Sequence, residues 1–453
     1  MKHTFIKLFR AIILVSASFI MLPSCSDYLD VVPDNIPTLD HAFADRFACE
    51  GFLFTCYSYL PRYGYVYGVP DFLSSDEFFT YDTPLNRMDR TTINIALGLQ
   101  SVSDPAYNTW DGTRQARPLY QAIRDCNIFL ENVDRPYDLE EYEKVRWVAE
   151  VNFLKAFYHF HMMQCYGPII LMDNNMPVSA TPDEVAQYRT PFDECVDYVS
   201  NLLDIAAKDL PPTIVDRSNE LGRATRPMAL ALKARLLAMA ASPLFNGNSD
   251  YVNVVDNRGV KLFNTTFDQE KWVKAANACK EAIEAAEQAD FGLLQEQDVQ
   301  QQYALNDTLK QQFNLRMILY SKWNKEMLWA SVRGNYKNDD NGIQDVSGCK
   351  ISMKELGQVH VRQTLAPTFS LVETYYTRNG VPINEDKDFD YNSRYLTRMA
   401  TRQDRWYIRE GEETANLHFD REPRFYSSIG FDRAIWWGNG SYDFSDANYA
   451  DDS

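Results

Sequence analysis

The stretch that decides the fold runs from Tyr142 to Tyr166 and reads YEKVRWVAEVNFLKAFYHFHMMQCY. Its small and aromatic apolar residues recur every three or four positions, which is the spacing of one face of an α-helix. They are Ala149, Phe153, Ala156, Phe160 and Met163. Gly167 and Pro168 follow directly, and such a pair is typical of a helix end. The pattern predicts a long helix that faces a core, followed by a short extended piece over residues 169–172.

Three further helices are predicted downstream of this one. Residues 191–210 form the first, which a Pro-Pro pair ends, and residues 222–243 form the second. Beyond its first turn the second helix has only Lys233 and Arg235 as charged residues, so we expect it at the centre of the fold. The third covers residues 269–288. Its expected buried stripe consists of Trp272, Ala275, Ala276, Cys279, Ala282, Ile283 and Ala286.

The helices are predicted to stack in pairs. Ala149-x3-Phe153 and Ala156-x3-Phe160 match part of the alanine and phenylalanine pattern of tetratricopeptide repeats, although the strict consensus is missing. Such pairs bury their apolar faces only by stacking on neighbours. We therefore expect a mostly α fold with degenerate, tetratricopeptide-like helix pairs. Residues 51–81, 246–266 and 295 to the end are irregular, and long loops of this kind usually carry binding residues.

The first 24 residues are predicted to be a lipoprotein signal peptide. Three basic residues precede an apolar run over residues 11–22, which is too short to span a bilayer because a span needs about 20 residues. Leu-Pro-Ser before Cys25 resembles a bacterial lipobox. This resemblance predicts cleavage before Cys25 and acylation of its thiol and of the new amine, which makes a stable anchor. The alternative is an ordinary cleaved signal with an incidental cysteine.

Length and charge narrow the function classes. With 453 residues, the chain suits one large core or two to three domains, and no later apolar run reaches the length of a membrane span. The formal net charge is -18, and it becomes -21 when the signal with its three basic residues and no acids is removed. Such a surface disfavours nucleic acid and anionic lipid headgroups and suits neutral ligands or cations. We interpret the excess of acidic residues mainly as a surface that keeps the protein soluble.

Seven cysteines remain after Cys25, and none forms a CxxC pair. In a chain of this size we expect them to be small buried apolar residues. An exported protein permits one disulfide. Cys49 and Cys56 cannot form it on a straight helix, because two turns separate them by about 10 Å.

Motifs for catalysis or cofactor binding are missing from the sequence. GxGxxG, Walker, GxSxG and HExxH patterns do not occur, and we expect no cofactor. His159 and His161 are two positions apart on a predicted helix, so they point to different faces and we expect them in the core or at its rim, with no metal bound. The sequence does not show how far apart two carboxylates lie in the fold, even for neighbours such as Asp76 and Glu77. A catalytic pair of carboxylates on either side of a sugar, as in glycosidases, therefore remains an open alternative.

Aromatic residues make up 13% of the chain, and 27 of them are tyrosines. The segment RYGYVYG at residues 62–68 concentrates them. A flat apolar ring with a polar tip complements the apolar face and hydroxyl edge of a sugar. We therefore predict stacking by the rings, with Asp76 and Asn335 binding hydroxyls, whereas the alternative is that these rings fill a core. The candidate glycan-binding residues are Tyr65, Tyr67, Asp76, Trp323, Asn335, Tyr336, Trp436 and Trp437.

Seven segments in order resemble the SusD/RagB family of outer-membrane nutrient-binding lipoproteins. They are CSDYLDVVP at 25–33, PLYQAIRDCNIFLENVD at 118–134, AEVNFLKAFYHFHMMQCYGPIIL at 149–171, GRATRPMALALKARLLAMAASP at 222–243, KEMLWA at 325–330, LAPTFSLVETYYTRNGVPI at 365–383 and REPRFYSSIGFDRAIWW at 421–437. The resemblance covers most of the mature chain. Family members normally continue well past the last segment, so the resemblance also implies a truncated C-terminal region.

The resemblance implies a non-enzymatic protein that is lipid-anchored at the cell surface on a bacterial outer membrane. Four tetratricopeptide-like helix pairs would form residues 25–290, and residues 291–453 would form a loop-rich region. Such a protein binds an oligosaccharide or another nutrient and passes it to a SusC-like TonB-dependent transporter. Two alternatives stay open, namely a secreted glycan hydrolase on a helical frame and a pure protein-interaction scaffold.

Overall fold

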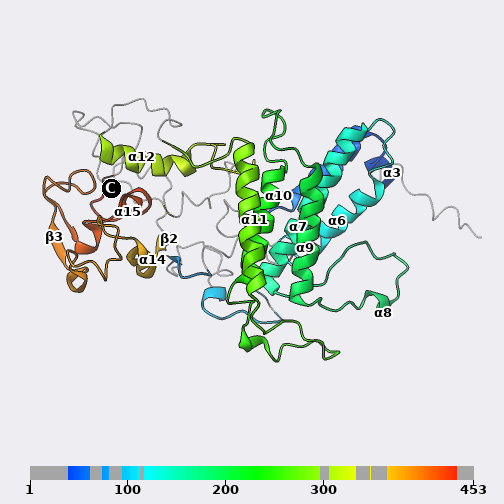
Figure 1. The fold of residues 1–453 in the computed structure, drawn as a ribbon, viewed down its shortest axis with the longest axis horizontal. Helices are drawn as coiled ribbons and strands as arrows, with labels where there is room; N and C mark the ends of the chain where they lie inside the picture. The colour runs from blue at the N-terminus through cyan, green and yellow to red at the C-terminus, as the bar shows by residue number, and fades with distance from the viewer. Residues whose placement is uncertain are drawn as a thin grey trace, which may run out of the picture.

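The computed structural model describes residues 39–61, 74–80, 94–103, 105, 107–112, 117–295, 306–332, 347 and 365–435. Two parts lie next to each other along the longest axis, a stack of long helices and a smaller lobe of short helices and strands (Figure 1). Several residues singled out from the sequence lie outside the described ranges. They are residues 1–24, Cys25, Tyr65, Tyr67, Asn335, Tyr336, Trp436 and Trp437.

Long antiparallel helices form the first part, which we call the helical stack. Its main members are α4 (Arg46–Ser58), α6 (Leu119–Asn132), α7 (Glu141–Tyr166), α9 (Phe192–Asp209), α10 (Arg226–Ala241) and α11 (Gln269–Gln288). The short helices α3 (Leu39–Ala42) and α8 (Pro182–Val185) and the 3-10 turn η3 (Ser249–Tyr251) lie in the connections. Successive long helices pack against each other from α6 to α11. The predicted mostly α fold is confirmed. Among the described helices, none is both long and apolar enough to cross a bilayer.

Helix α7 is the long helix with a core-facing stripe that its sequence predicts. All five residues of its predicted stripe are buried, and so are residues on its other sides such as Leu154, Tyr158 and Met162. The helix is covered on several sides because α4, α6 and α9 all pack on it. Residues 169–172, expected to be extended, form no strand and run as an irregular segment in which the Tyr120 hydroxyl accepts a hydrogen bond from Ile170 N at 3.0 Å.

Helix α10 takes the expected central position between α9 and α11, and the predicted stripe of α11 is confirmed at Ala275 and Ala282 but wrong at its larger residues. Ala275, Ala278 and Ala282 are the buried residues of α11, whereas Trp272 and Ile283 are exposed. The small alanine side chains let the axes of α10 and α11 approach closely. Since α11 packs mainly against α10, one narrow face is covered and the larger apolar residues of the predicted stripe point outward.

Two expectations about the first part of the chain need correction. Residues 51–58, expected to be irregular, continue α4, whose N-cap Asp45 accepts a hydrogen bond from Ala48 N at 2.8 Å. The cysteines are not all buried. Cys165 and Cys279 are exposed, and the described cysteines are all free thiols, including those at 49 and 56. The buried ones, as predicted, are Cys49, Cys56, Cys126 and Cys195.

The second part, which we call the lobe, has its own small core. Its elements are α12 (Asp307–Tyr320), β2 (Leu365–Pro367), α14 (Phe369–Thr374), η5 (Tyr391–Ser393), β3 (Thr397–Met399), β4 (Glu413–Ala415), η6 (Asn416–His418) and α15 (Pro423–Ser428). Strands β3 and β4 pair antiparallel, with Arg398 opposite Thr414. Strand β1 (Phe78–Thr80) comes from early in the chain and pairs antiparallel with β2. The core of the lobe consists of Val372, Ile383, Leu417, Phe425, Tyr426 and Ile429.

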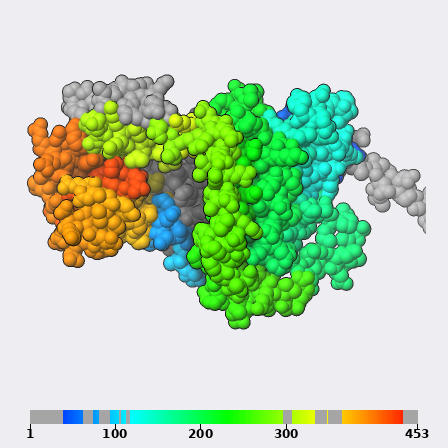
Figure 2. Space-filling view, viewed as in Figure 1, coloured from blue at the N-terminus to red at the C-terminus, as the bar shows by residue number. Residues whose placement is uncertain are grey.

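Helix α12 and the segment after it connect the two parts. On the lobe side, Arg316 donates from Nη2 to the Tyr426 carbonyl at 3.1 Å. On the stack side, Trp329 Nε1 donates to the Gly222 carbonyl at 2.9 Å, and the indole contacts the Phe153 ring edge-on at 5.1 Å. Figure 2 shows the two parts as adjoining bodies, with residues 74–80 in blue beside the lobe.

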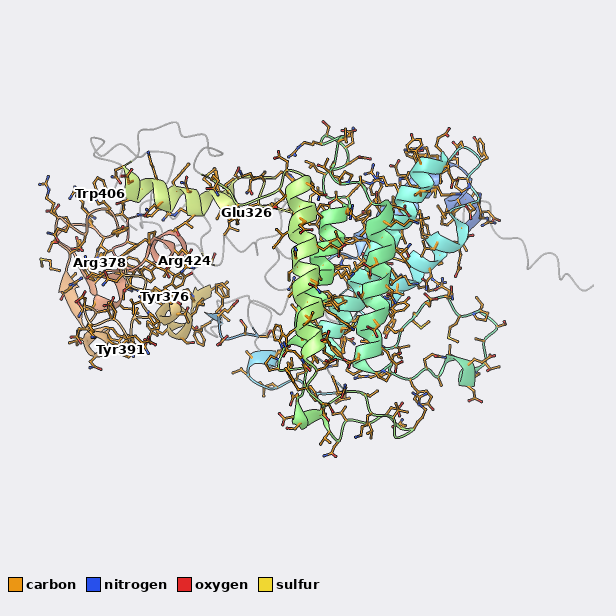
Figure 3. All side chains as sticks on the ribbon, in the orientation of Figure 1. Glu326, Tyr376, Arg378, Tyr391, Trp406 and Arg424 are labelled. Atoms are coloured by element: carbon orange, nitrogen blue, oxygen red, sulfur yellow. The ribbon has the colours of Figure 1, made fainter. Side chains whose placement is uncertain are left out.

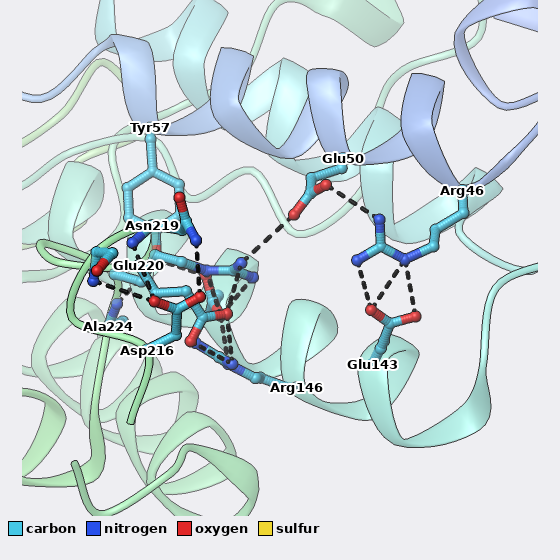
Figure 4. Close-up of polar contacts among 12 residues, drawn as sticks. Arg46, Glu50, Tyr57, Glu143, Arg146, Asp216, Asn219, Glu220 and Ala224 are labelled. Carbon is cyan, nitrogen blue, oxygen red and sulfur yellow. Dashed lines mark hydrogen bonds and ion pairs between the residues drawn. The ribbon is translucent and has the colours of Figure 1, made fainter. Parts of the chain in front are cut away.

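A buried polar network fixes the loop before α10 to the helical stack (Figure 4). Glu150 on α7 is fully buried and accepts hydrogen bonds from Tyr57 Oη at 2.7 Å, Arg146 Nε at 3.0 Å and Arg223 Nε at 3.0 Å. Tyr57 Oη in turn accepts from Ala224 N at 2.9 Å. A buried carboxylate that is paired this fully holds its partners in a single arrangement.

Candidate ligand-binding surface

Two of the sequence-predicted site residues lie within the described ranges. Asp76 is exposed just before β1, and its carbonyl accepts a hydrogen bond from Thr368 Oγ1, the N-cap of α14. Trp323 is half-buried after α12, where its carbonyl accepts from Arg217 Nη2 at 3.4 Å. Asp76 therefore belongs to the lobe and Trp323 to the boundary with the helical stack. Their roles as ligands stay predictions.

The backbone at Trp323 is unusual. Its φ of 55° lies in the left-handed region, which a residue with a side chain seldom adopts. The surrounding segment is tied down, because Asn324 donates to the carbonyls of Ile318 and Ser321, both at 2.9 Å. Strain that is held by its surroundings is found more often at functional sites than elsewhere.

An exposed aromatic surface lies on the lobe beside Asp76. Phe79, Phe369 and Tyr395 are exposed at 63%, 67% and 53%. The rings of Phe369 and Tyr395 meet edge-on with centroids 5.6 Å apart. Phe79 lies opposite Ala366 in the β1–β2 pair, three positions before Phe369. We call these three residues the aromatic surface. Single exposed rings are common, whereas exposed rings in contact, as Phe369 and Tyr395 are, favour a binding region.

Local structure explains why these rings face outward. Thr368 caps α14 by accepting a hydrogen bond from Leu371 N at 3.2 Å. Val372 then turns into the lobe core, so Phe369 and Glu373, four positions apart, share the opposite face of the helix. Glu373 therefore emerges next to the Phe369 ring.

Glu373 organises the polar half of this surface. It accepts hydrogen bonds from Arg394 Nε at 2.7 Å, from Tyr391 Oη at 2.9 Å and from the Tyr395 hydroxyl. The Arg394 guanidinium also lies over the rings of Tyr391 and Tyr395, 3.8 and 4.3 Å from their centroids. Groups locked in this way lose little freedom when a ligand binds.

The electrostatics of Glu373 suit binding rather than acid catalysis. Burial raises the pKa of its carboxyl, but hydrogen bonds from Tyr395, Arg394 and Tyr391 outweigh burial and hold the pKa below its ordinary value. The hydrogen bond to Glu373 raises the pKa of the Tyr395 hydroxyl, which keeps it protonated. A general acid in glycoside hydrolysis needs a raised carboxyl pKa, so Glu373 is not tuned for that role.

The sequence alone did not identify most of this surface. Phe369, Tyr391, Arg394 and Tyr395 lie on segments that were interpreted as structural or irregular. The available signal was the four-residue spacing of Phe369 and Glu373, which places an aromatic ring and a carboxylate on one helical face. Figure 3 shows Tyr391 in the lobe together with Tyr376, Arg378 and Arg424.

Histidines and metal ligands do not form a second site in the described ranges. His159 is fully buried, and its Nδ1 lies 2.7 Å from the Lys155 carbonyl, while His161 is also buried. Both are core residues, as predicted. Within residues 39–435 as described, no group of three or more His, Cys, Asp or Glu side chains is arranged to hold a metal ion.

Two models of known families match the chain, each over a different stretch. A family model described as "Starch-binding associating with outer membrane" matches residues 73–237, and the SusD family model matches residues 325–453. No curated protein sequence matches the chain.

Solved structures share the fold of this chain. The chain is similar to BT4246 at 29% identity with a TM-score of 0.71, over 86% of this chain and 66% of that one. It is similar in fold to the SusD-like protein BF3747 from Bacteroides fragilis, at 20% identity and a TM-score of 0.59, over 86% and 62% of the two chains. For the SusD-like carbohydrate-binding protein BF0978 from the same species these values are 18%, 0.53, 87% and 61%.

The chain thus spans about two thirds or less of the length of these structures. The two family models match different stretches, one mostly in the helical stack and one mostly in the lobe, and the solved structures share the arrangement of both. The chain belongs to the SusD/RagB family.

Proposed function

We propose that this protein is a non-catalytic glycan-binding lipoprotein on the surface of a bacterial outer membrane. In this proposal Cys25 carries the lipid anchor, residues 25–290 form the scaffold and residues 291–453 contribute binding loops. The bound oligosaccharide passes to a SusC-like TonB-dependent transporter. The family description, which names starch binding and association with the outer membrane, supports the proposal.

The observation that carries the proposal is the exposed pair of rings, Phe369 and Tyr395, next to the Glu373–Arg394 pair. The rings offer an apolar platform for a sugar face. The Glu373 carboxylate and the nearby Asp76 offer acceptors for hydroxyl groups, and hydrogen bonds to charged groups contribute about 1.5–3 kcal/mol each. One platform and a few fixed acceptors are what a non-covalent sugar site requires.

Removal of both rings tests the proposal. The mature protein and its Phe369→Ala/Tyr395→Ala variant are titrated calorimetrically with malto-, xylo- and galacturono-oligosaccharides. We expect at least tenfold weaker binding, equivalent to about 1.4 kcal/mol. The melting temperature should change little, because both side chains are largely exposed.

A matched control removes two exposed rings from the helical stack, Tyr137 and Tyr142. Tyr137→Ala/Tyr142→Ala should bind as the parent protein does. Equal affinity of the lobe variant and the parent would refute the proposed surface. Release of reducing sugar from a polysaccharide panel would instead identify a hydrolase, and we expect none.

A further inference from the structure

Two arginines on the lobe converge on a single carboxylate. Arg378 Nη1 lies 3.2 Å from Asp420 Oδ1, and Arg398 Nη2 lies 2.8 Å from Asp420 Oδ2. The side chains of Arg378 and Arg398 are exposed at 66% and 48%. A guanidinium has five N–H donors, and Asp420 engages only part of them. We call Arg378 and Arg398 the arginine pair.

Rigid backbone holds the arginine pair in place. Arg398 lies on β3, and its guanidinium rests 4.0 Å from the centroid of the buried Phe419 ring. Arg378 N donates to the Asp420 carbonyl at 2.8 Å, next to the bridge between Thr377 and Arg421. Both guanidinium groups are therefore preorganised, which lowers the entropic cost of binding a ligand.

A buried cation lies directly behind this pair. Arg421 is 2% exposed, and its guanidinium donates to the carbonyls of Leu417, Val372 and Tyr375 at 2.7–2.8 Å. Burial lowers the pKa of Arg421 to about 10, so the group stays charged at neutral pH. Within the described residues, the Arg421 guanidinium donates its hydrogen bonds to backbone carbonyl oxygens. These acceptors are neutral, so no carboxylate is hydrogen-bonded to this cation there.

Two neighbouring carboxylates differ in their partners. Glu422 pairs with Arg424 at 2.7 Å, whereas Asp386 accepts from the neutral Asn379 Nδ2 at 3.0 Å and keeps its negative charge near Arg378. Glu413 lies opposite Met399 in the β3–β4 pair, so it points to the face away from Arg398, because side chains alternate along a strand.

The arginine pair and Arg421 place three cations close to Asp420, in a protein whose formal charge is -18. At physiological ionic strength the Debye length is about 8 Å, so the distant acidic surface is largely screened from a ligand in contact with the lobe. The local cluster therefore governs which charge a ligand can bring there.

The arginine pair and two residues of the aromatic surface, Phe369 and Tyr395, come from the same two segments, residues 369–378 and 391–399. Leu417 N donates to the Arg394 carbonyl, and the Leu417 carbonyl accepts from Arg421, so one backbone frame carries both. Arg398 is three residues after Tyr395, so their Cα atoms are at most about 11 Å apart, a span that a ligand of more than one sugar unit can bridge.

We infer that the glycan bound by the lobe is anionic, and that Arg378 and Arg398 bind its carboxylate or sulfate groups. The planar guanidinium fork matches these oxyanions in a two-point geometry. This inference rests on the proposed function and names the ligand class of the same surface. It differs from the expectation, drawn from net charge, that neutral ligands or cations suit this protein.

Matched probes test the inference. The mature protein is titrated with oligogalacturonides and their carboxyl-reduced counterparts, and with sulfated and unsulfated dextran oligomers. We expect the anionic member of at least one pair to bind ten times more tightly or better. Preference for the oligogalacturonide or for the sulfated dextran distinguishes carboxylate from sulfate. Raising the salt from roughly 50 mM to 500 mM should weaken that binding, because it shortens the Debye length.

Variants assign the effect to the arginine pair. Arg378→Gln/Arg398→Gln should lose most of the preference for the anionic probe. Arg124→Gln/Arg235→Gln removes the same charge from exposed positions of the helical stack and should keep it. If the first double variant unfolds, Arg398→Lys retains the charge without the fork and should lose part of the preference.

The outcomes separate the two proposals. Equal or tighter binding of the neutral probes overturns the inference and leaves glycan binding standing. An equal loss in both double variants also overturns it, because net charge alone would then explain the preference. If no glycan of either class binds to the folded protein, the proposed function fails and this inference falls with it.

Discussion

A carboxylate that accepts hydrogen bonds from tyrosine and arginine side chains occurs both in the helical stack and in the lobe. In the stack, the fully buried carboxylate of Glu150 on α7 accepts from Tyr57 and from two arginines. In the lobe, the carboxylate of Glu373, whose side chain is 20% exposed, accepts from Tyr391, Tyr395 and Arg394. The comparison teaches that burial, rather than residue type, decides what such a set can do.

Buried, the set holds segments together. Removing one member of a buried, hydrogen-bonded ion pair leaves the other charges without compensation, which costs about 3–5 kcal/mol. At the surface, water replaces a lost partner, and exposed pairs contribute about 0–1 kcal/mol to stability. The lobe set therefore contributes little to folding, and its polar atoms remain within reach of a ligand.

The largest expected effect comes from breaking the buried set. Glu150→Gln should lower the free energy of unfolding by about 3 kcal/mol, because Arg146 and Arg223 lose their fully buried partner and keep only the more exposed Glu220 and Glu50. Urea denaturation measures it. Glu284→Gln, in the exposed pair with Lys280, is the control and should change stability by less than about 0.5 kcal/mol. A loss of similar size in both variants would contradict the comparison.

Acid should weaken both regions by a smaller amount. Burial lowers the pKa of His159 in the stack and of His418 in the lobe to about 4, from 6.5 in the unfolded chain. The unfolded chain therefore takes up these protons first, so stability is fully present above pH 6.5 and is lost as the pH falls toward 4. Each histidine contributes about 2–3 kcal/mol to this loss.

Chemical denaturation at several pH values from about 7 to about 4 checks this expectation, because the two histidines titrate in this range. His159→Gln and His418→Gln should each make the pH dependence shallower. A pH dependence that stays unchanged in both variants would show that these imidazoles are not the groups that take up protons on unfolding.

The smallest effect on stability is expected from the exposed set. Glu373→Gln should lower the free energy of unfolding by about 1–2 kcal/mol, less than Glu150→Gln does, since the Glu373 and Arg394 side chains are still 20% and 18% exposed. Its glycan affinity should fall about tenfold, because the Tyr391, Arg394 and Tyr395 side chains lose the charge that orients them. A variant that unfolds readily but binds normally would reverse the assignment of roles.

Much of the helical stack could be predicted because the spacing of apolar residues along the sequence indicates which face of a helix is buried. Residues 191–210 were expected to be helical and α9 covers Phe192–Asp209, while α11 begins and ends at the expected Gln269 and Gln288. The face of α11 was the exception. Periodicity finds an apolar face, but it does not show which neighbour covers it, so Trp272 and Ile283 were placed inside.

The aromatic surface could not be predicted in the same way. Phe79 reaches the lobe through a strand pair with residues 365–367, which are distant in sequence. Phe369 and Tyr395 meet across short elements that show no periodicity. Tertiary contacts of this kind leave no local pattern, so loop composition pointed to the lobe without identifying the residues.

Hydrogen exchange with and without a bound oligosaccharide tests the central claim most directly. The account predicts slower amide exchange in residues 369–378 and 391–399 when a glycan that binds in the titrations is added, and unchanged exchange in α7. Protection confined to the helical stack, with the lobe exchanging as it does without ligand, would contradict the account.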